Sequence, residues 1–306
     1  MTAASTEIAT ATSARGAGIV RSRHRGTGWL GFTPFALYVL LFLAIPTVYA
    51  VGSGFFTDSG QLTLANLAAF GNPTIVADFV GSFWVSAVVA LVGAVVGALI
   101  CFALLGAKPG GALRTVVDSA SSVLAQFGGI MLAFAFIALM GIQGVLTLFL
   151  KQTFGFDLNS LSAHGPLLYQ VGGLVFPYLY FSVPLMVITF MPAMEGLKKE
   201  WGEAAATLGA SRFSYWWRIA FPVLAPAFWG STILLFANAF SSFATAAALI
   251  DQGGIVPLAI KQQLTSETVV GVSNTAGVLA LGMIVVMVVV MSAYSALQRR
   301  ARRWQR

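Results

Sequence analysis

Six uninterrupted apolar stretches constrain this chain more than any other feature of its sequence. A helix needs roughly 20 residues to cross a hydrocarbon core of about 30 Å, and each stretch is long enough. We place them near residues 30–52, 81–105, 119–142, 166–194, 223–250 and 272–297, and none of these ranges contains Lys, Arg, Asp or Glu. Only 9% of all residues are charged, whereas a soluble domain carries about 25%. The sequence therefore predicts an all-α membrane protein with six transmembrane helices.

The basic residues are distributed unevenly between the two sides of this predicted bundle. Fifteen of the 17 Lys and Arg residues lie in the two terminal tails and in the loops near 106–118 and 195–222. The alternate loops contain only Lys151 and Lys261. Positive charge is retained on the cytoplasmic side, so we expect both termini to be cytoplasmic. The net charge of +7 is therefore better explained by attraction of these basic segments to anionic lipid than by nucleic-acid binding.

These features divide the chain into three parts. Residues 1–28 lack periodicity and are expected to form a disordered cytoplasmic tail. Residues 29–298 form the six-helix domain, with a long cytoplasmic loop at 195–222, and residues 299–306 form a basic cytoplasmic tail. Inside the second stretch, Gly93 and Gly97 form a small-residue pair that is typical of a close helix contact.

The loop at 195–222 reads EGLKKEWGEAAATLGASRFSYWWRIAFP. Apolar residues recur at helical spacing up to Leu208, and Gly209 is expected to end this first helix. Ser211 or Ser214 can cap a second short helix, which we expect Pro222 to end before the fifth span. The sequence therefore predicts two helices joined by a bend at Gly209.

Two interpretations of this loop are open. An amphipathic helix at the membrane interface would carry such aromatic and basic residues. The spacing, however, resembles the EAA signature of binding-protein-dependent ABC importer permeases: Glu203-Ala204-Ala205, three residues, Gly209, nine residues, Ile219, two residues, Pro222. Phe221 stands where that family usually has leucine.

The resemblance implies a fold, partners and roles. The fold would be that of a type I ABC importer permease. The loop would be the coupling helix, in which Glu203, Ala204 and Ala205 contact an ABC ATPase dimer and Gly209 sets the bend. The other implied partners are a second permease subunit, either a copy or a different chain, and an extracytoplasmic substrate-binding protein.

A second stretch resembles one branch of this family. The run from Phe240 to Leu249, a following glycine pair and Val256-Pro257-Leu258 are similar to spermidine/putrescine-type permeases. The same branch includes permeases for thiamine, ferric iron, sulfate and phosphonates. The resemblance favours this branch over sugar permeases, which stay an alternative, and it does not identify the solute.

The sequence contains no recognisable motif for nucleotide binding, metal binding or catalysis. No GxxxxGK[ST] phosphate-binding loop occurs, so ATP would be used by a partner subunit. Two histidines and the single Cys101 form no metal-ligand pattern, and no nucleophile–base set is visible. We therefore expect a transport subunit that binds no cofactor and is not an enzyme.

Polar residues follow one predicted face of the fifth span. Asn238, Ser242 and Thr245 recur at i, i+4 and i+7, and Ser241 lies beside them. Such groups avoid lipid, so they either join helices by hydrogen bonds or line a translocation path.

Two other classes of function compete with the importer permease. A secondary transporter driven by an ion gradient usually keeps a carboxylate or a broken-helix ion site within the membrane, and the predicted spans contain no carboxylate. A membrane-embedded enzyme would need the catalytic set that the sequence lacks.

Overall fold

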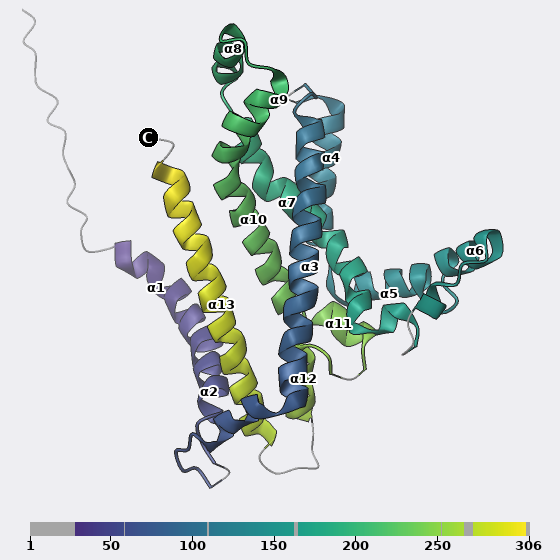
Figure 1. The fold of residues 1–306 in the computed structure, drawn as a ribbon. Coiled ribbons are helices and arrows are strands. Elements are labelled where there is room, and N and C mark those ends of the chain that lie inside the picture. Colours follow the sequence, from purple (N-terminus) through teal and green to yellow (C-terminus); the bar gives the residue numbers. More distant parts are fainter. Residues whose placement is uncertain are drawn as a thin grey trace, which may run out of the picture. The chain divides into compact units, whose positions relative to one another are not determined.

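The computed structural model describes residues 28–57, 59–108, 110–161, 165–251, 253–265 and 272–303, and these are almost entirely helical. The predicted tail therefore lies outside the described residues, apart from Gly28. The helices are α1 (Gly28–Val39), α2 (Ile45–Ser53), α3 (Pro73–Leu104), α4 (Ala112–Leu124), α5 (Gly129–Met140), α6 (Val145–Phe154), α7 (Val175–Glu195), α8 (Lys199–Thr207), α9 (Arg212–Tyr215), α10 (Phe221–Ser241), α11 (Ala244–Leu249), α12 (Val256–Thr265) and α13 (Val272–Arg303) (Figure 1).

The chain divides into two compact units, residues 1–48 and 49–306. In the first, α1 continues through a π-helical turn at Leu40–Ala44 into the start of α2. The second unit contains the end of α2 and the helices from α3 to α13.

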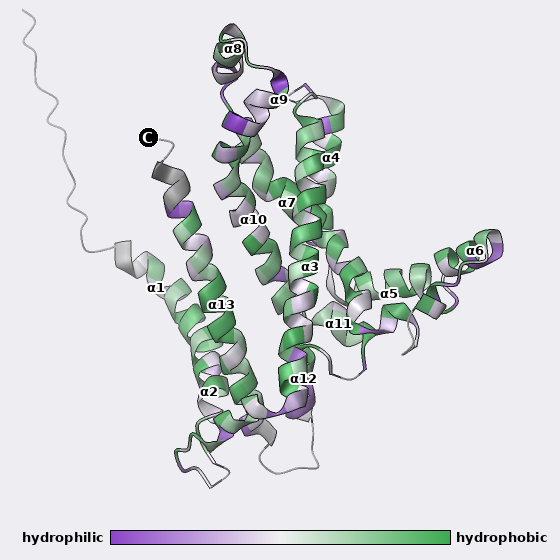
Figure 2. Cartoon of the chain, in the orientation of Figure 1, coloured by the Kyte–Doolittle hydropathy of each residue, from purple (hydrophilic) through white to green (hydrophobic). Residues whose placement is uncertain are grey.

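Six segments of the described chain are long and apolar enough to cross a membrane, as the sequence predicts (Figure 2). They are Gly31–Ser53, Pro73–Leu104, Gly129–Phe154, Val171–Glu195, Arg212–Ser241 and Asn274–Arg299. Green, apolar residues run along these helices, and purple residues gather mainly at their ends and in the loops (Figure 2).

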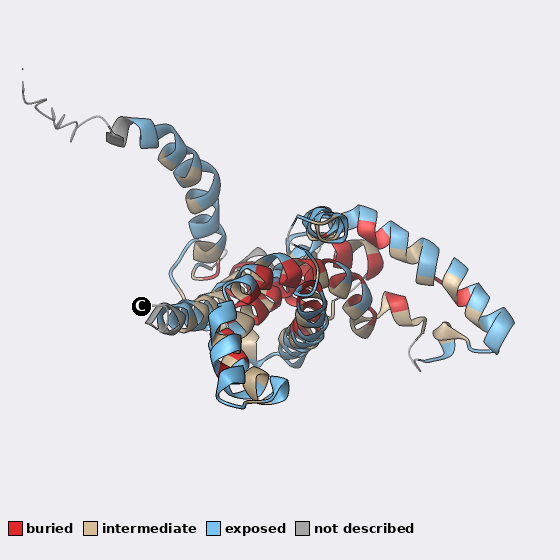
Figure 3. Cartoon of the chain, turned by 90° about the horizontal axis from the view of Figure 1, so that it is seen from above, coloured by how far each residue is buried: buried red, intermediate tan, exposed pale blue. Residues whose placement is uncertain are grey.

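Helices α3, α7 and α10 form the core of the larger unit, where buried residues concentrate (Figure 3). A side chain at Gly97 would place its Cβ 2.5 Å from the Cβ of Met186 on α7. At Gly93 it would lie 3.3 Å from both the Ser182 Cβ and the Leu235 Cδ2. The predicted close contact at the glycine pair is therefore confirmed, and its physical basis is the absence of Cβ atoms between the backbones.

The opposite end of α3 holds the chain between α11 and α12. The Asp78 carboxylate accepts a hydrogen bond from the Gly254 N–H at 2.6 Å, and the Ser82 hydroxyl oxygen accepts one from the Val256 N–H at 2.8 Å. Ser82 thus satisfies the first backbone donor of α12, which has no intrahelical partner, and Asp78 satisfies a donor in the loop just before this helix.

The third span differs from the prediction of one helix over residues 119–142. Helix α4 ends at Leu124 and α5 begins at Gly129, so the predicted span contains a break. Gly128 is extended, with φ −138° and ψ −164°, and Gly129 has φ +74°. Two adjacent glycines allow this reversal of backbone geometry, which a residue with a Cβ would oppose. Beyond the break, α5 and α6 turn crosswise to α3 and α7 (Figure 1).

The fifth span also ends earlier than predicted. Helix α10 stops at Ser241, and Ser242 adopts extended backbone angles of φ −72° and ψ +117°. Helix α11 then forms a separate short segment. The prediction of one helix over residues 223–250 is therefore wrong at its C-terminal end.

Candidate functional site

A helical elbow, residues 195–222, projects from one end of the larger unit beyond α7 and α10 (Figure 1). It contains α8, a bend at Gly209, and α9, as the sequence predicts. The Ser211 hydroxyl oxygen accepts a hydrogen bond from the Ser214 N–H at 3.2 Å, so Ser211 caps α9. A local sequence signal, the Ser211 cap, therefore sets the start of α9.

Gly209 makes the bend through a defined C-terminal motif. Its φ is +76°, in the left-handed region that favours glycine. Its N–H donates to the Ala206 carbonyl at 3.0 Å, and the N–H of Ala210 donates to the Ala205 carbonyl at 2.9 Å. This pair of bonds is the Schellman motif, which satisfies the free carbonyls at a helix end.

The three residues of the predicted signature differ in exposure. Glu203 and Ala204 lie on the exposed face of α8, whereas Ala205 is only 5% exposed. On the inner side, a Cβ at Gly202 would lie 4.0 Å from the Tyr215 ring, because α8 folds back toward α9. Glu203 and Ala204 are thus available to a partner, while Ala205 packs within the elbow.

The second half of the elbow does not end at Pro222 as predicted. From α9 the chain passes through a π-helical turn, Trp216–Ala220, directly into α10. The N–H of Phe221 donates to the carbonyl of Trp216, five residues back. Proline lacks an N–H and its ring crowds the carbonyl four residues before it. The wider π-helical turn accommodates Pro222 without ending the helix.

An exposed stack of rings follows this continuous helix. Phe213 and Trp217 are stacked with ring centroids 6.4 Å apart, and Trp217 and Phe221 are stacked at 5.6 Å. All three are more than half exposed. Together with the exposed Arg212 and Arg218, they have the composition of a segment at a membrane interface.

Ion pairs hold the base of the elbow to α4. The Arg114 guanidinium on α4 pairs with the carboxylate of Glu195, the last residue of α7. Its Nε also lies 3.6 Å from the Asp118 carboxylate one turn along α4. The Arg114 side chain is only 14% exposed, whereas both carboxylate side chains are about half exposed. Sequence reasoning missed this cluster, since residues 114 and 195 lie in different predicted loops.

The predicted polar stripe is not one helical face, because α10 ends at Ser241. Asn238 and Ser241 are exposed near that end, and the Ser241 hydroxyl donates to the Ala237 carbonyl at 2.9 Å. The Ser242 carbonyl accepts a hydrogen bond from the Tyr178 hydroxyl at 2.9 Å. Ser241 and Ser242 therefore make hydrogen bonds that the predicted helical spacing did not indicate.

Thr245 joins two helices. Its fully buried hydroxyl donates to the Gly129 carbonyl at 3.1 Å and accepts from the Gly129 N–H at 3.0 Å. Gly129 begins α5 immediately after the break, so this bond pair holds α11 to the turning point of the third span. For Thr245, the interpretation as an interhelical hydrogen-bonding residue describes the geometry.

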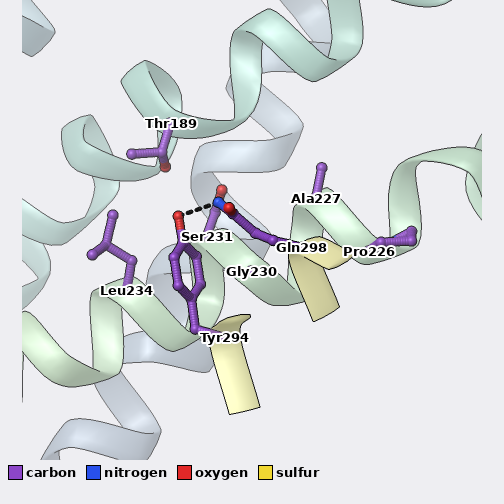
Figure 4. Close-up of a pocket in the computed structure, with 8 residues that line it drawn as sticks. All are labelled: Thr189, Pro226, Ala227, Gly230, Ser231, Leu234, Tyr294 and Gln298. Atoms are coloured by element: carbon purple, nitrogen blue, oxygen red, sulfur yellow. Dashed lines mark hydrogen bonds between the residues drawn. The ribbon is translucent and has the colours of Figure 1, made fainter. Parts of the chain in front are cut away.

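A cavity of ≈ 380 Å³ with both polar and apolar lining lies between α7, α10 and α13 (Figure 4). Thr189, Ser231, Tyr294 and Gln298 turn their polar ends toward the same place, and the Gln298 amide donates to the Tyr294 hydroxyl (Figure 4). The rest of the lining is apolar or glycine: Pro226, Ala227, Gly230 and Leu234. Sequence reasoning missed this cavity, since each helix contributes only one or two polar residues to it.

Comparisons with known proteins agree with this geometry. Residues 166–303, which include the elbow and the cavity, match the family model described as "Binding-protein-dependent transport system inner membrane component". The sulfate transport system permease protein CysT of Salmonella typhimurium is 26% identical over 209 residues, covering 68% of this chain and 69% of that protein. The spermidine/putrescine permease protein PotB of Haemophilus influenzae is 22% identical over 264 residues, covering 84% and 89%.

A solved structure has the same fold. The crystal structure of a bacterial ABC transporter involved in the import of the acidic polysaccharide alginate superimposes with a TM-score of 0.67. The alignment covers 89% of this chain and 96% of that chain at 14% sequence identity. At this identity the similarity concerns the fold alone.

Proposed function

We propose that this chain, an inner-membrane permease of the ABC importer class whose residues 166–303 belong to the binding-protein-dependent inner membrane components, is driven by a separate ATPase that docks on its elbow. The single observation that supports this most is the elbow itself: α8 projects from the bundle and exposes Glu203 and Ala204. A short rigid helix outside the bundle is suited to transmit a displacement from a motor protein to the spans.

The role of each residue follows from its position. Glu203 offers a carboxylate for a charge-assisted hydrogen bond, and Ala204 allows close approach. Ala205 keeps α8 packed in the elbow, and Gly209 fixes the angle between α8 and α9. Because α9 continues into α10 without a break, a displacement of α8 would reach the core of the bundle.

The assembly would contain an ABC ATPase dimer, a second permease subunit and an extracytoplasmic binding protein. ATP would be used by the ATPase, and this chain would bind no cofactor and catalyse no reaction. Basic Arg212 and Arg218 lie in the elbow, and Arg299 lies near the C-terminal end of α13. Their positions support an orientation with the elbow and both termini in the cytoplasm.

The solute belongs to a class that the relatives do not fix, since they include sulfate and spermidine/putrescine permeases. Of the path residues predicted from sequence, Asn238 and Ser241 are the exposed ones. We propose that these two line the path, and that Ser242 and Thr245, which bond to Tyr178 and Gly129, would support its wall.

The test is Gly209→Pro in the complex expressed with its partner subunits. Proline requires a φ near −65° and has no N–H, so this variant loses both the +76° conformation and the bond to Ala206. We expect loss of solute uptake with normal membrane abundance. Gly202→Ala, at a helical position in α8, is the matched control and should transport normally. Wild-type uptake by the proline variant would refute the coupling role.

A further inference from the structure

The cavity between α7, α10 and α13 combines an apolar lining with polar groups from all three helices. Ser231 is only 6% exposed and turns its hydroxyl toward the cavity (Figure 4). A hydroxyl in this position can bond to a ligand or to water in the cavity. The volume of ≈ 380 Å³ lies at the small end of the range for ligand pockets.

The hydrogen-bonding capacity of the lining is mixed. The Gln298 amide N–H donates to the Tyr294 oxygen. This bond uses neither the Tyr294 proton, which can donate to a ligand, nor the Gln298 amide oxygen, which can accept from one. Ser231 can donate and accept. The Thr189 hydroxyl donates to its own helix at the Leu185 carbonyl, 2.9 Å away, and keeps its acceptor capacity. The cavity thus offers donors and acceptors together.

None of the residues that line this cavity is charged. A polyamine presents only donors and carries positive charge, and sulfate presents only acceptors and carries negative charge. Either ion would enter a site without an opposite charge, which is unfavourable. A polyhydroxylated solute presents donors and acceptors on the same groups, and its C–H faces suit the ring of Tyr294 and the apolar side formed by Pro226 and Leu234.

We propose that this cavity binds a small uncharged polyhydroxylated solute on the cytoplasmic side of the transport path. The proposal rests on the proposed function for the orientation of the chain and for the transport role. Ser231 lies on α10, which continues from the elbow, whereas Tyr294 and Gln298 lie on α13. Movement of the elbow would separate these two sets of groups and release the solute.

Equilibrium dialysis of the assembled complex in lipid nanodiscs tests the proposal. The uncharged probes are radiolabelled glycerol, sorbitol and trehalose, and unlabelled sulfate and putrescine serve as competitors. We expect at least one uncharged probe to bind, without displacement by either ion. Ser231→Ala and Gln298→Leu should each raise its Kd by about 2- to 10-fold, the effect of one lost hydrogen bond.

The matched control is Thr265→Val, which removes an exposed hydroxyl on α12 that is bonded to the Lys261 carbonyl of its own helix. It should leave the Kd unchanged. Absence of binding for all three uncharged probes, an unchanged Kd in both cavity variants, or displacement by sulfate or putrescine would overturn the proposal.

A parallel measurement separates this proposal from the proposed function. The Gly209→Pro complex should lose uptake yet bind the uncharged probe as the wild type does. If that variant transports normally while the cavity variants bind weakly, the coupling role fails and the binding site stands. If uptake is lost in Gly209→Pro but no uncharged probe binds, the coupling role stands and the binding site fails.

Discussion

Removal of the Arg114–Glu195 ion pair should loosen the base of the elbow by an amount that the structure allows us to estimate. Exposed ion pairs contribute about 0.2–1 kcal/mol, and breaking a buried pair costs about 3–5 kcal/mol. Arg114 is nearly buried, whereas Glu195 is about half exposed. A cavity of ≈ 240 Å³ lined by both residues leaves room for water beside them. We therefore expect a coupling free energy of about 1–2 kcal/mol, between the two limits.

A double-mutant cycle measures this quantity. The variants are Arg114→Ala, Glu195→Ala and the double variant, and the measured quantity is the unfolding free energy of the purified chain in mixed micelles titrated with SDS. The same variants, assembled with their partners, give the number of ATP molecules hydrolysed per solute imported. We expect this ratio to rise, because an elbow detached from α4 would move without moving the third span.

The matched control is Lys198→Ala, which removes an exposed positive charge three residues beyond Glu195. It should change the unfolding free energy by less than about 0.5 kcal/mol, as is usual for a surface substitution. Strict additivity of the two single variants, or equal effects of Arg114→Ala and Lys198→Ala, would refute the argument.

Two further predictions concern the bundle and the end of α6. Gly97→Val should prevent normal packing of α3 on α7 and lower membrane abundance, because even a Cβ would lie 2.5 Å from that of Met186; normal abundance on immunoblots would contradict the contact. At Asp157, the hydrogen bond from Lys151 at 2.8 Å lowers the pKa of the carboxyl. The pair therefore stabilises the fold above the unfolded-state pKa and is lost as the pH falls through the folded-state pKa. Lys151→Met should raise the pKa of Asp157 in an NMR titration, and an unchanged pKa would show that the pair does not persist.

The elbow could be predicted from sequence because its signals are local. Gly209 follows a helical pattern and Ser211 precedes another, and neither depends on distant residues. The helix break at Gly128 was missed because apolar residues continue on both sides of it, so hydropathy alone indicates one span. The glycine pair at 128–129 was the available signal, and it indicates a break only if positive φ is considered.

The cavity and the ion-pair cluster could not be predicted for a different reason. Ser231 and Tyr294 are 63 positions apart along the chain and meet only because α10 packs on α13. Likewise, Arg114 meets Glu195 only because α4 packs on α7. A periodic pattern within one helix shows which face is polar, but it contains no information about which other helix that face meets.

The π-helical turn at Trp216–Ala220 sets the rotation of the elbow about the helix axis relative to α10. Each residue of an α-helix turns the chain by about 100° about the helix axis. The extra residue held in the π-helical turn therefore rotates α9 about that axis relative to α10. The direction in which α8 points is thus set by a residue count, independently of which face α10 presents to α3 and α7. Loss of one residue from this turn would leave both helices intact and direct α8 toward a different side of the molecule.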